Sequence, residues 1–157
     1  MGLNFEPHRY RFRSCWELPA APPDLVYRVL AEPLGYPAWW PEIRRVRQLS
    51  EDSGEMTFRS FLPYELRVRV RATRQDPAGR VLAARLDGDL DGGTRWTVTT
   101  RGDGGSVAVF DEDVVVRKRS MRVLALPGRP AFRANHAVMM RHGRAGLISY
   151  LRAVHWS

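Results

Sequence analysis

Side chains that could exchange protons stand at two places in the C-terminal third of the chain. Strict alternation in the segment from Ser106 to Arg117 places Asp111 and Asp113 on one face and Glu112 on the other, so one carboxylate set must point inward. His136 falls on the apolar stripe of a later helical segment. A carboxyl group and an imidazole that meet in a dry cavity could act together in proton transfer.

Other catalytic motifs are missing from the sequence. It contains no phosphate-binding glycine loop, no HExxH, no nucleophile elbow of the G-x-S-x-G type and no helical histidine pair at positions i and i+4. His136 and His142 are six residues apart and face different sides of a helix, which argues against a metal site. We therefore expect no metal and no organic cofactor.

Cysteine content and apolar runs bear on the compartment. Cys15 is the only cysteine, which excludes a disulfide framework and a thiolate-rich metal site and favours a reducing compartment. No apolar run approaches the length of a signal peptide or a membrane span. We expect a cytoplasmic protein with a single domain over residues 1–157.

Alternating apolar and polar residues predict most of the secondary structure as strands. The strands are expected at His8 to Leu18, from about Arg45, and at Glu55 to Leu62, Tyr64 to Arg74, Arg80 to Leu86, Thr94 to Arg101 and Ser106 to Arg117. Pro63 predicts a tight connection, and the Gly-Asp rich stretch from Gly88 to Gly93 predicts a corner.

Helical periodicity is confined to a short segment after Pro22 and to one long segment at the C-terminal end. Because Pro127 and Pro130 should interrupt a helix, we expect the long helix from about Ala131 to Val154. Gly143 and Gly146 each cost about 1 kcal/mol relative to alanine in a helix interior. Something should therefore approach this helix closely, either the backbone of the sheet or a ligand.

The chain is basic, with a net charge of +8, and Lys118 is the only lysine among its 25 basic residues. The arginines alternate with apolar residues, so they should share the outer face of the sheet: Arg9, Arg11, Arg13, Arg67, Arg69 and Arg71. A solvated surface is one interpretation, and a docking face for RNA or an anionic membrane is the other. The aromatic side chains lie on the opposite face, so we expect no specific nucleic-acid binding, only weak association with anionic membranes or other polyanions.

Five segments in order carry a family resemblance over nearly the whole chain: Ala21 to Leu30, Tyr36 to Ile43 (YPAWWPEI), Leu62 to Gly79, Gly88 to Trp96 (GDLDGGTRW) and Arg129 to Leu151. Together they resemble the polyketide cyclase/dehydrase and lipid-transport branch of the START-like superfamily, also called SRPBCC. The resemblance implies an α+β helix-grip fold, in which a seven-stranded antiparallel sheet curls around a long C-terminal helix and leaves an apolar cavity between them. It implies no single reaction, because catalytic residues are not shared across this superfamily.

Aromatic and methionine side chains are the expected lining of that cavity, because they suit flat or flexible apolar ligands. The candidates are Tyr10, Phe12, Trp16, Phe58, Tyr64, Trp96, Met139, Met140, Gly143, Leu147 and Tyr150. Trp39 and Trp40 are expected either at the cavity mouth or in a packed aromatic lid without a ligand role. Each of these residues could instead be plain core.

The resemblance also implies that the last strand neighbours the first. Asp111 and Asp113 would then pair with Arg11 and Arg13, and Glu112 would face the helix and meet His136 in the cavity. The alternative is that His136 makes only local hydrogen bonds and Glu112 reaches solvent at the rim.

Three functions remain after this reasoning. The first is binding or carriage of a small hydrophobic or aromatic molecule such as a lipid, polyketide or isoprenoid. The second is a cyclase or dehydratase in which His136 and Glu112 transfer protons and Tyr10 or Tyr64 orients an oxygen. The third is an interaction module that uses the arginine-rich face.

Overall fold

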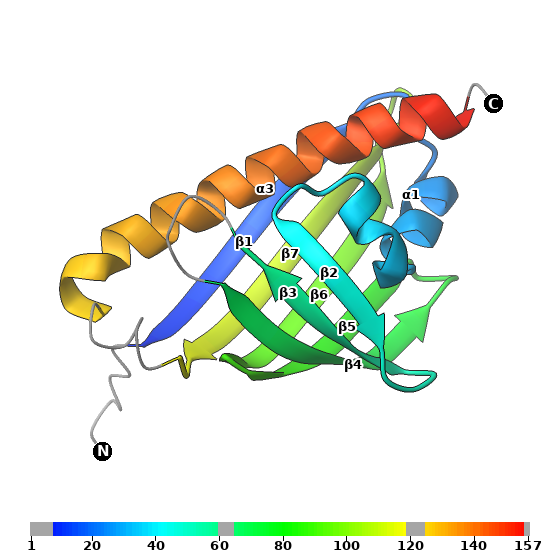
Figure 1. The fold of residues 1–157 in the computed structure, drawn as a ribbon. Helices are drawn as coiled ribbons and strands as arrows, with labels where there is room; N and C mark the ends of the chain where they lie inside the picture. The colour runs from blue at the N-terminus through cyan, green and yellow to red at the C-terminus, as the bar shows by residue number, and fades with distance from the viewer. Residues whose placement is uncertain (1–7, 60–64, 119–124, 156–157) are drawn as a thin grey trace, which may run out of the picture.

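The computed structural model describes residues 8–59, 65–118 and 125–155, with the side chains of the last range described from 129 to 154. Figure 1 shows the elements, which are β1 (Arg9–Leu18), α1 (Pro23–Leu30), the 3-10 helix η1 (Pro33–Ala38), β2 (Ile43–Gln48), β3 (Ser53–Phe58), β4 (Leu66–Asp76), β5 (Val81–Gly88), β6 (Leu90–Thr100), β7 (Ser106–Val116) and α3 (Ala125–His155). The expected connection at Pro63 lies outside the described residues.

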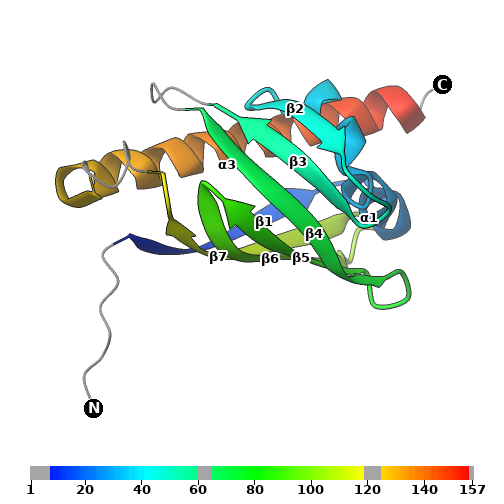
Figure 2. The ribbon, with the colours of Figure 1, turned by 60° about the horizontal axis from the view of Figure 1, so that its bottom comes forward.

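The strands form one antiparallel seven-stranded sheet in the order β1-β7-β6-β5-β4-β3-β2. Only the β1–β7 pairing joins strands that are distant in sequence. The sheet is strongly curled, and α3 runs along its concave side (Figures 1 and 2). The α+β helix-grip fold expected from the sequence is confirmed.

Alternation sets the register of the sheet, as β4 illustrates. Leu66 and Val68 are buried on the concave side, whereas Arg67 and Arg69 are exposed on the other. A slip by one residue would bury guanidinium groups and expose the apolar set, which fixes the pairing of β4 with its neighbours.

The start of the long helix differs from the prediction. α3 begins at Ala125 and contains Pro130, rather than beginning at Ala131. Pro127 falls in the first turn, where backbone N–H groups have no intrahelical partner, so a proline costs no hydrogen bond there. Pro130 removes one hydrogen bond near the helix start, and the helix continues through it.

The predicted corner from Gly88 to Gly93 is shorter than expected. β5 ends at Gly88 and β6 begins at Leu90, so Gly92 and Gly93 lie within a strand. A Cβ atom on Gly92 would lie 1.9 Å from the Asp113 carbonyl oxygen, so only glycine permits this close approach of β6 to β7. Turn composition alone does not distinguish a corner from a strand whose glycines allow close pairing.

Two apolar clusters fill the space on the concave side. The larger lies beneath the C-terminal half of α3 and centres on Trp16, Trp39, Trp40 and Leu147. The smaller lies beneath the start of α3 and includes Phe132. Among the described residues, no helix combines the length and apolarity needed to cross a membrane.

Candidate functional site

A cavity of about 500 Å³ lies between the curled sheet and the N-terminal half of α3. Five residues of α3 line it, and all precede Arg141: Phe132, Asn135, His136, Met139 and Met140. The sheet contributes mainly apolar side chains, among them Phe12, Met56, Phe58, Leu66, Val68, Val70, Leu86, Leu90, Trp96 and Phe110. The cavity is therefore an apolar chamber with a few polar groups on its wall.

The cavity opens between η1 and the tips of two hairpins. The exposed residues of its lining come from the ranges 32–35 and 48–52 and from Arg74 and Gln75. In Figure 1 these segments lie at the end of the sheet away from the start of α3. The cavity therefore extends from η1 along the sheet to Phe132.

Glu112 and His136 meet on the cavity wall. The distance from His136 Nε2 to Glu112 Oε2 is 3.0 Å, and the two side chains are only 14% and 11% exposed. An ionised Glu112 can only accept a hydrogen bond. Nε2 of His136 therefore carries the proton and donates a hydrogen bond to the carboxylate. In the neutral imidazole Nδ1 then holds the lone pair.

Phe12 fixes the plane of the imidazole. Its ring is stacked on that of His136 with 3.7 Å between centroids and an interplanar angle of 9°. Phe12 is also the direct cross-strand partner of Glu112, so β1 and β7 place both contacts of the histidine side by side. The arrangement holds one imidazole in one orientation at an apolar wall.

The model of the family described as polyketide cyclase/dehydrase and lipid transport matches residues 17–148. The chain belongs to this family. No curated protein sequence matches the chain. The fold agrees with that of the Zhui aromatase/cyclase from Streptomyces sp. R1128, with a TM-score of 0.77 and 21% identity over 92% of this chain and 94% of that one. A START superfamily protein from Mycobacterium smegmatis is similar, with a TM-score of 0.70 and 15% identity over 94% of this chain and 99% of that one.

In this polyketide cyclase and lipid-transport family member, several residues predicted for the cavity do line it. They are Phe12, Phe58, Trp96, Met139, Met140 and Trp40, together with Glu112 and His136. Their shared property is a position on the concave face opposite the N-terminal half of α3. Tyr64, also predicted, lies outside the described residues.

The remaining predicted cavity residues are core rather than lining. Trp16, Leu147 and Tyr150 pack in or against the larger apolar cluster, and Tyr10 is buried against Phe132 with their ring centroids 4.4 Å apart. Arg129 Cζ also lies over the Tyr10 ring, 4.5 Å from its centroid, and burial raises the pKa of the phenol. The prediction failed here because alternation shows which face a residue occupies and not what lies opposite it.

The two helix glycines contact the tryptophan pair rather than the sheet backbone, and neither glycine is in the cavity lining. A Cβ atom on Gly146 would lie 1.7 Å from the Trp39 carbonyl oxygen, and one on Gly143 would lie 2.5 Å from Trp40 Cε2. Trp40 Nε1 also donates a hydrogen bond of 2.9 Å to the Met139 carbonyl. Trp39 is therefore packed beneath the helix, while Trp40 both packs there and lines the cavity.

A second acid and histidine pair was not foreseen. Glu42, whose side chain is 6% exposed, contacts Nδ1 of the half-exposed His142 through Oε1. Glu42 follows the tryptophan pair in a loop, where periodicity predicts no facing partner. This pair attaches the loop to α3 outside the cavity lining.

The sequence reasoning also missed cavity residues that a stricter use of alternation would have found. Phe110 shares a face with Glu112, and Met56 shares a face with Phe58, so both follow from the same pattern. Tyr36 and Asn135 also line the cavity and carried no comparable signal.

The outer face of the sheet carries the expected arginines, and carboxylates of neighbouring strands pair with several of them. Arg9 contacts Asp113, Arg13 contacts Asp111 and Arg69 contacts Asp87, each with a shortest distance of 2.7 Å. The hydrogen bond from Arg9 lowers the pKa of Asp113. RNA or membrane docking by this face stays a prediction.

Proposed function

We propose that the protein binds a small hydrophobic or aromatic molecule in the cavity between the sheet and the N-terminal half of α3. The observation that carries the proposal is the cavity of about 500 Å³ with its predominantly apolar lining. Binding sites for small molecules typically measure about 300 to 1,000 Å³ and combine apolar walls with a few polar groups. Family membership, which includes lipid transport in its description, supports the same conclusion.

The affinity would come mainly from removing apolar ligand surface from water, which contributes about 25 cal/mol per Å². The rings of Phe12, Trp96 and Phe110 offer polarizable area to a flat ligand. Met56 and Met139 add side chains that adapt to an irregular outline.

Native mass spectrometry after incubation with a lipid extract tests this proposal. The wild-type protein is expected to retain a bound molecule, and Val70→Phe, which places a ring in the cavity, is expected to lose most of it. Val115→Phe is the matched control, because Val115 pairs with Arg9 on the outer face and does not line the cavity. Empty wild-type protein, or equal retention by Val70→Phe, would contradict the proposal.

A second candidate function is a cyclase or dehydratase reaction on a polyketide-type substrate. The contact of 3.0 Å between His136 and Glu112 on the cavity wall favours it. The imidazole would accept a proton from the substrate at Nδ1, and Glu112 would stabilise the imidazolium that forms. The family description and the aromatase/cyclase with the same fold support this candidate.

Turnover of a linear poly-β-ketone substrate analogue tests the second candidate. His136→Ala and Glu112→Gln are expected to lower kcat by about 100-fold or more, with a melting temperature close to that of the wild type. Arg141→Ala is the control, since this exposed residue lies on the same helix and outside the cavity lining. A large loss of stability in His136→Ala with turnover retained would assign the histidine a structural role.

A further inference from the structure

The charges around the cavity have the opposite sign to the charge of the chain. The chain carries 25 basic and 17 acidic residues, with a net charge of +8. Four carboxylates and one guanidinium line the cavity: Glu32, Glu51, Asp52 and Glu112 against Arg74. In this basic protein, carboxylates therefore outnumber guanidinium groups in the lining of the cavity.

The single lining arginine does not offset this charge. Arg74 forms an ion pair with Asp76 at 3.2 Å, and Asp76 also accepts hydrogen bonds from the turn that follows it. The guanidinium thus already faces a carboxylate of its own strand. A ligand carboxylate at the entrance would meet Glu51 and Asp52 without a free cation among the described lining residues.

The interior wall presents the same sign. Glu112 is nearly buried and contacts Nε2 of His136. Even a protonated His136 would carry only one positive charge, which the Glu112 carboxylate already balances. Two like charges a few ångströms apart repel strongly where water is excluded. An anionic group that reached this wall would lose its hydration and gain no new cation.

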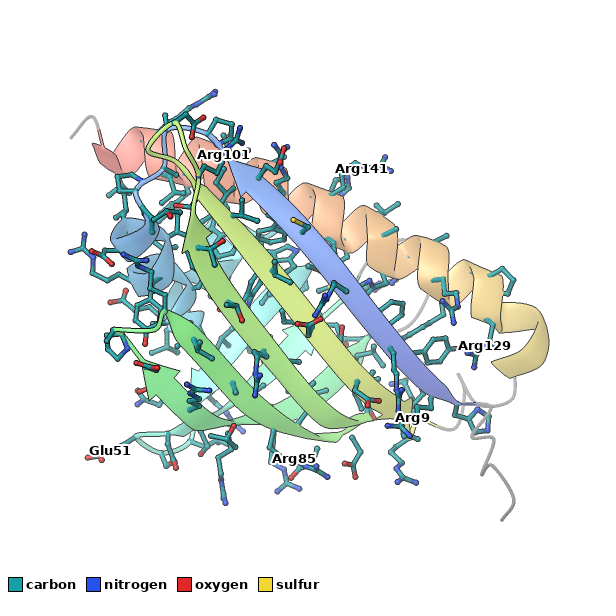
Figure 3. All side chains as sticks on the ribbon, turned by 180° about the vertical axis from the view of Figure 1, so that it is seen from behind. Arg9, Glu51, Arg85, Arg101, Arg129 and Arg141 are labelled. Carbon is teal, nitrogen blue, oxygen red and sulfur yellow. The ribbon has the colours of Figure 1, made fainter. Side chains whose placement is uncertain are left out.

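Among the described residues, no arginine other than Arg74 lines the cavity. Figure 3 shows Arg85 pointing away from the helix on the outer face, and Arg9 and Arg129 at the opposite end from Glu51. Arg71 and Arg85 are register partners on the outer face of β4 and β5, and Arg85 also forms an ion pair with Asp91. The arginine-bearing outer face of the sheet is therefore distinct from the cavity lining, in which carboxylates outnumber guanidinium groups.

We infer that the cavity selects an uncharged ligand, bearing at most a hydroxyl or carbonyl oxygen, and rejects carboxylate- or phosphate-bearing amphiphiles. The inference rests on the proposed function, because it assigns the ligand class of the same cavity. It runs against the expectation from net charge alone, by which a protein of charge +8 would favour anions.

Three probes with the same planar body and different charge test the inference: 2-naphthol, 2-naphthoate and 2-naphthylmethylamine at neutral pH. Isothermal titration calorimetry is expected to show that naphthol binds about tenfold or more tightly than naphthoate. Naphthoate binding should strengthen as salt is raised, because salt screens the repulsion at the entrance. Tighter binding of naphthoate or of the ammonium probe than of naphthol would overturn the inference.

Charge variants separate repulsion from the general cost of burying an anion. The triple variant Glu32→Gln, Glu51→Gln and Asp52→Asn should improve the affinity for naphthoate relative to that for naphthol by about threefold or more. The control triple is Glu17→Gln, Asp24→Asn and Asp87→Asn, whose carboxylates are more than half exposed and lie outside the lining.

The outcomes of this experiment are distinguishable. An equal gain for naphthoate in both triple variants would overturn the charge inference and leave the proposed function standing. Failure of all three probes to bind would overturn the proposed function itself.

Discussion

The two halves of α3 contact the rest of the molecule in different ways. The C-terminal half lies directly on the tryptophan pair, at Gly143 and Gly146, with no room for a single added methyl group. The N-terminal half stands over the cavity and presents long side chains such as His136 and Met139 to it. One helix therefore serves as a packed anchor over one half and as the wall of a chamber over the other.

The comparison shows how a cavity can persist in a small domain. The side chains that line an empty apolar cavity lack dispersion contacts on one side, which lowers the stability of the fold. Rigid packing elsewhere in the domain must therefore keep the cavity open. The contacts of Trp39 and Trp40 with the helix glycines supply that packing, and Trp40 marks the boundary because it also lines the cavity. Changes in the packed half should affect stability, and changes in the chamber should affect binding.

Gly146→Ala is expected to have the largest effect. The new methyl group would collide with the Trp39 carbonyl oxygen, which belongs to the backbone and cannot turn away, so the helix must shift. We expect a loss of about 3 kcal/mol in the free energy of unfolding, measured by urea denaturation. Wild-type stability in this variant would show that Gly146 is packed less tightly against Trp39 than the structure indicates.

Tyr36→Phe tests η1, the segment that precedes Trp39 and Trp40, and should have a somewhat smaller effect. The buried Tyr36 hydroxyl donates a hydrogen bond to the Leu30 carbonyl, and its removal should cost about 1 to 2 kcal/mol of unfolding free energy.

Burial also raises the pKa of Tyr36. Because the unfolded phenol ionises at about pH 10, wild-type stability from this group is present below that pH and lost as pH rises above it. The destabilisation of Tyr36→Phe relative to wild type should therefore shrink in alkaline urea titrations, and a constant difference would contradict this.

Val70→Phe tests the other half of the comparison. The added ring enters the existing chamber rather than packed core, so the free energy of unfolding should change by less than about 1.5 kcal/mol. Ligand affinity should fall at the same time by about tenfold or more. Loss of stability on the scale of Gly146→Ala would mean that the two halves of α3 do not differ in packing.

Asp113→Asn lies on the outer face and should have the smallest effect. The ion pair with Arg9 is well exposed, so we expect a loss of less than about 1 kcal/mol and no change in ligand affinity. The hydrogen bond from Arg9 lowers the pKa of Asp113 in the folded state. The stabilisation is thus complete above the unfolded value of about 3.9 and disappears as pH falls through the folded value. Urea titrations should show the two proteins converging in acid.

Sequence patterns predicted the parts of the fold that periodicity controls. Alternation located the strands, and with the family resemblance it led to the expectation that Glu112 and His136 would face each other, which the structure shows. Alternation could not distinguish lining from core, since Phe12 and Trp16 occupy the same face of β1 and only the former borders the cavity. That difference depends on which half of α3 lies opposite, a tertiary relation.

Irregular segments were the other source of error. Pro130 predicts a helix break, yet α3 continues through it. The lost hydrogen bond costs little compared with the stability that the long helix gains from packing. The contact of Glu42 with His142 joins a loop to a helix 100 residues away, and no local pattern encodes it. The helix glycines did signal a close approach, although their partner was the tryptophan pair.

Methyl NMR of the protein with 2-naphthol bound tests the central claim most directly. With labelled methionine and isoleucine methyl groups, the structure predicts intermolecular nuclear Overhauser effects from the ligand to Met56, Met139 and Met140, which line the cavity. It predicts none to Ile148, which packs against the core under the C-terminal half of α3. Contacts at Ile148 without contacts at the three methionines would contradict the account.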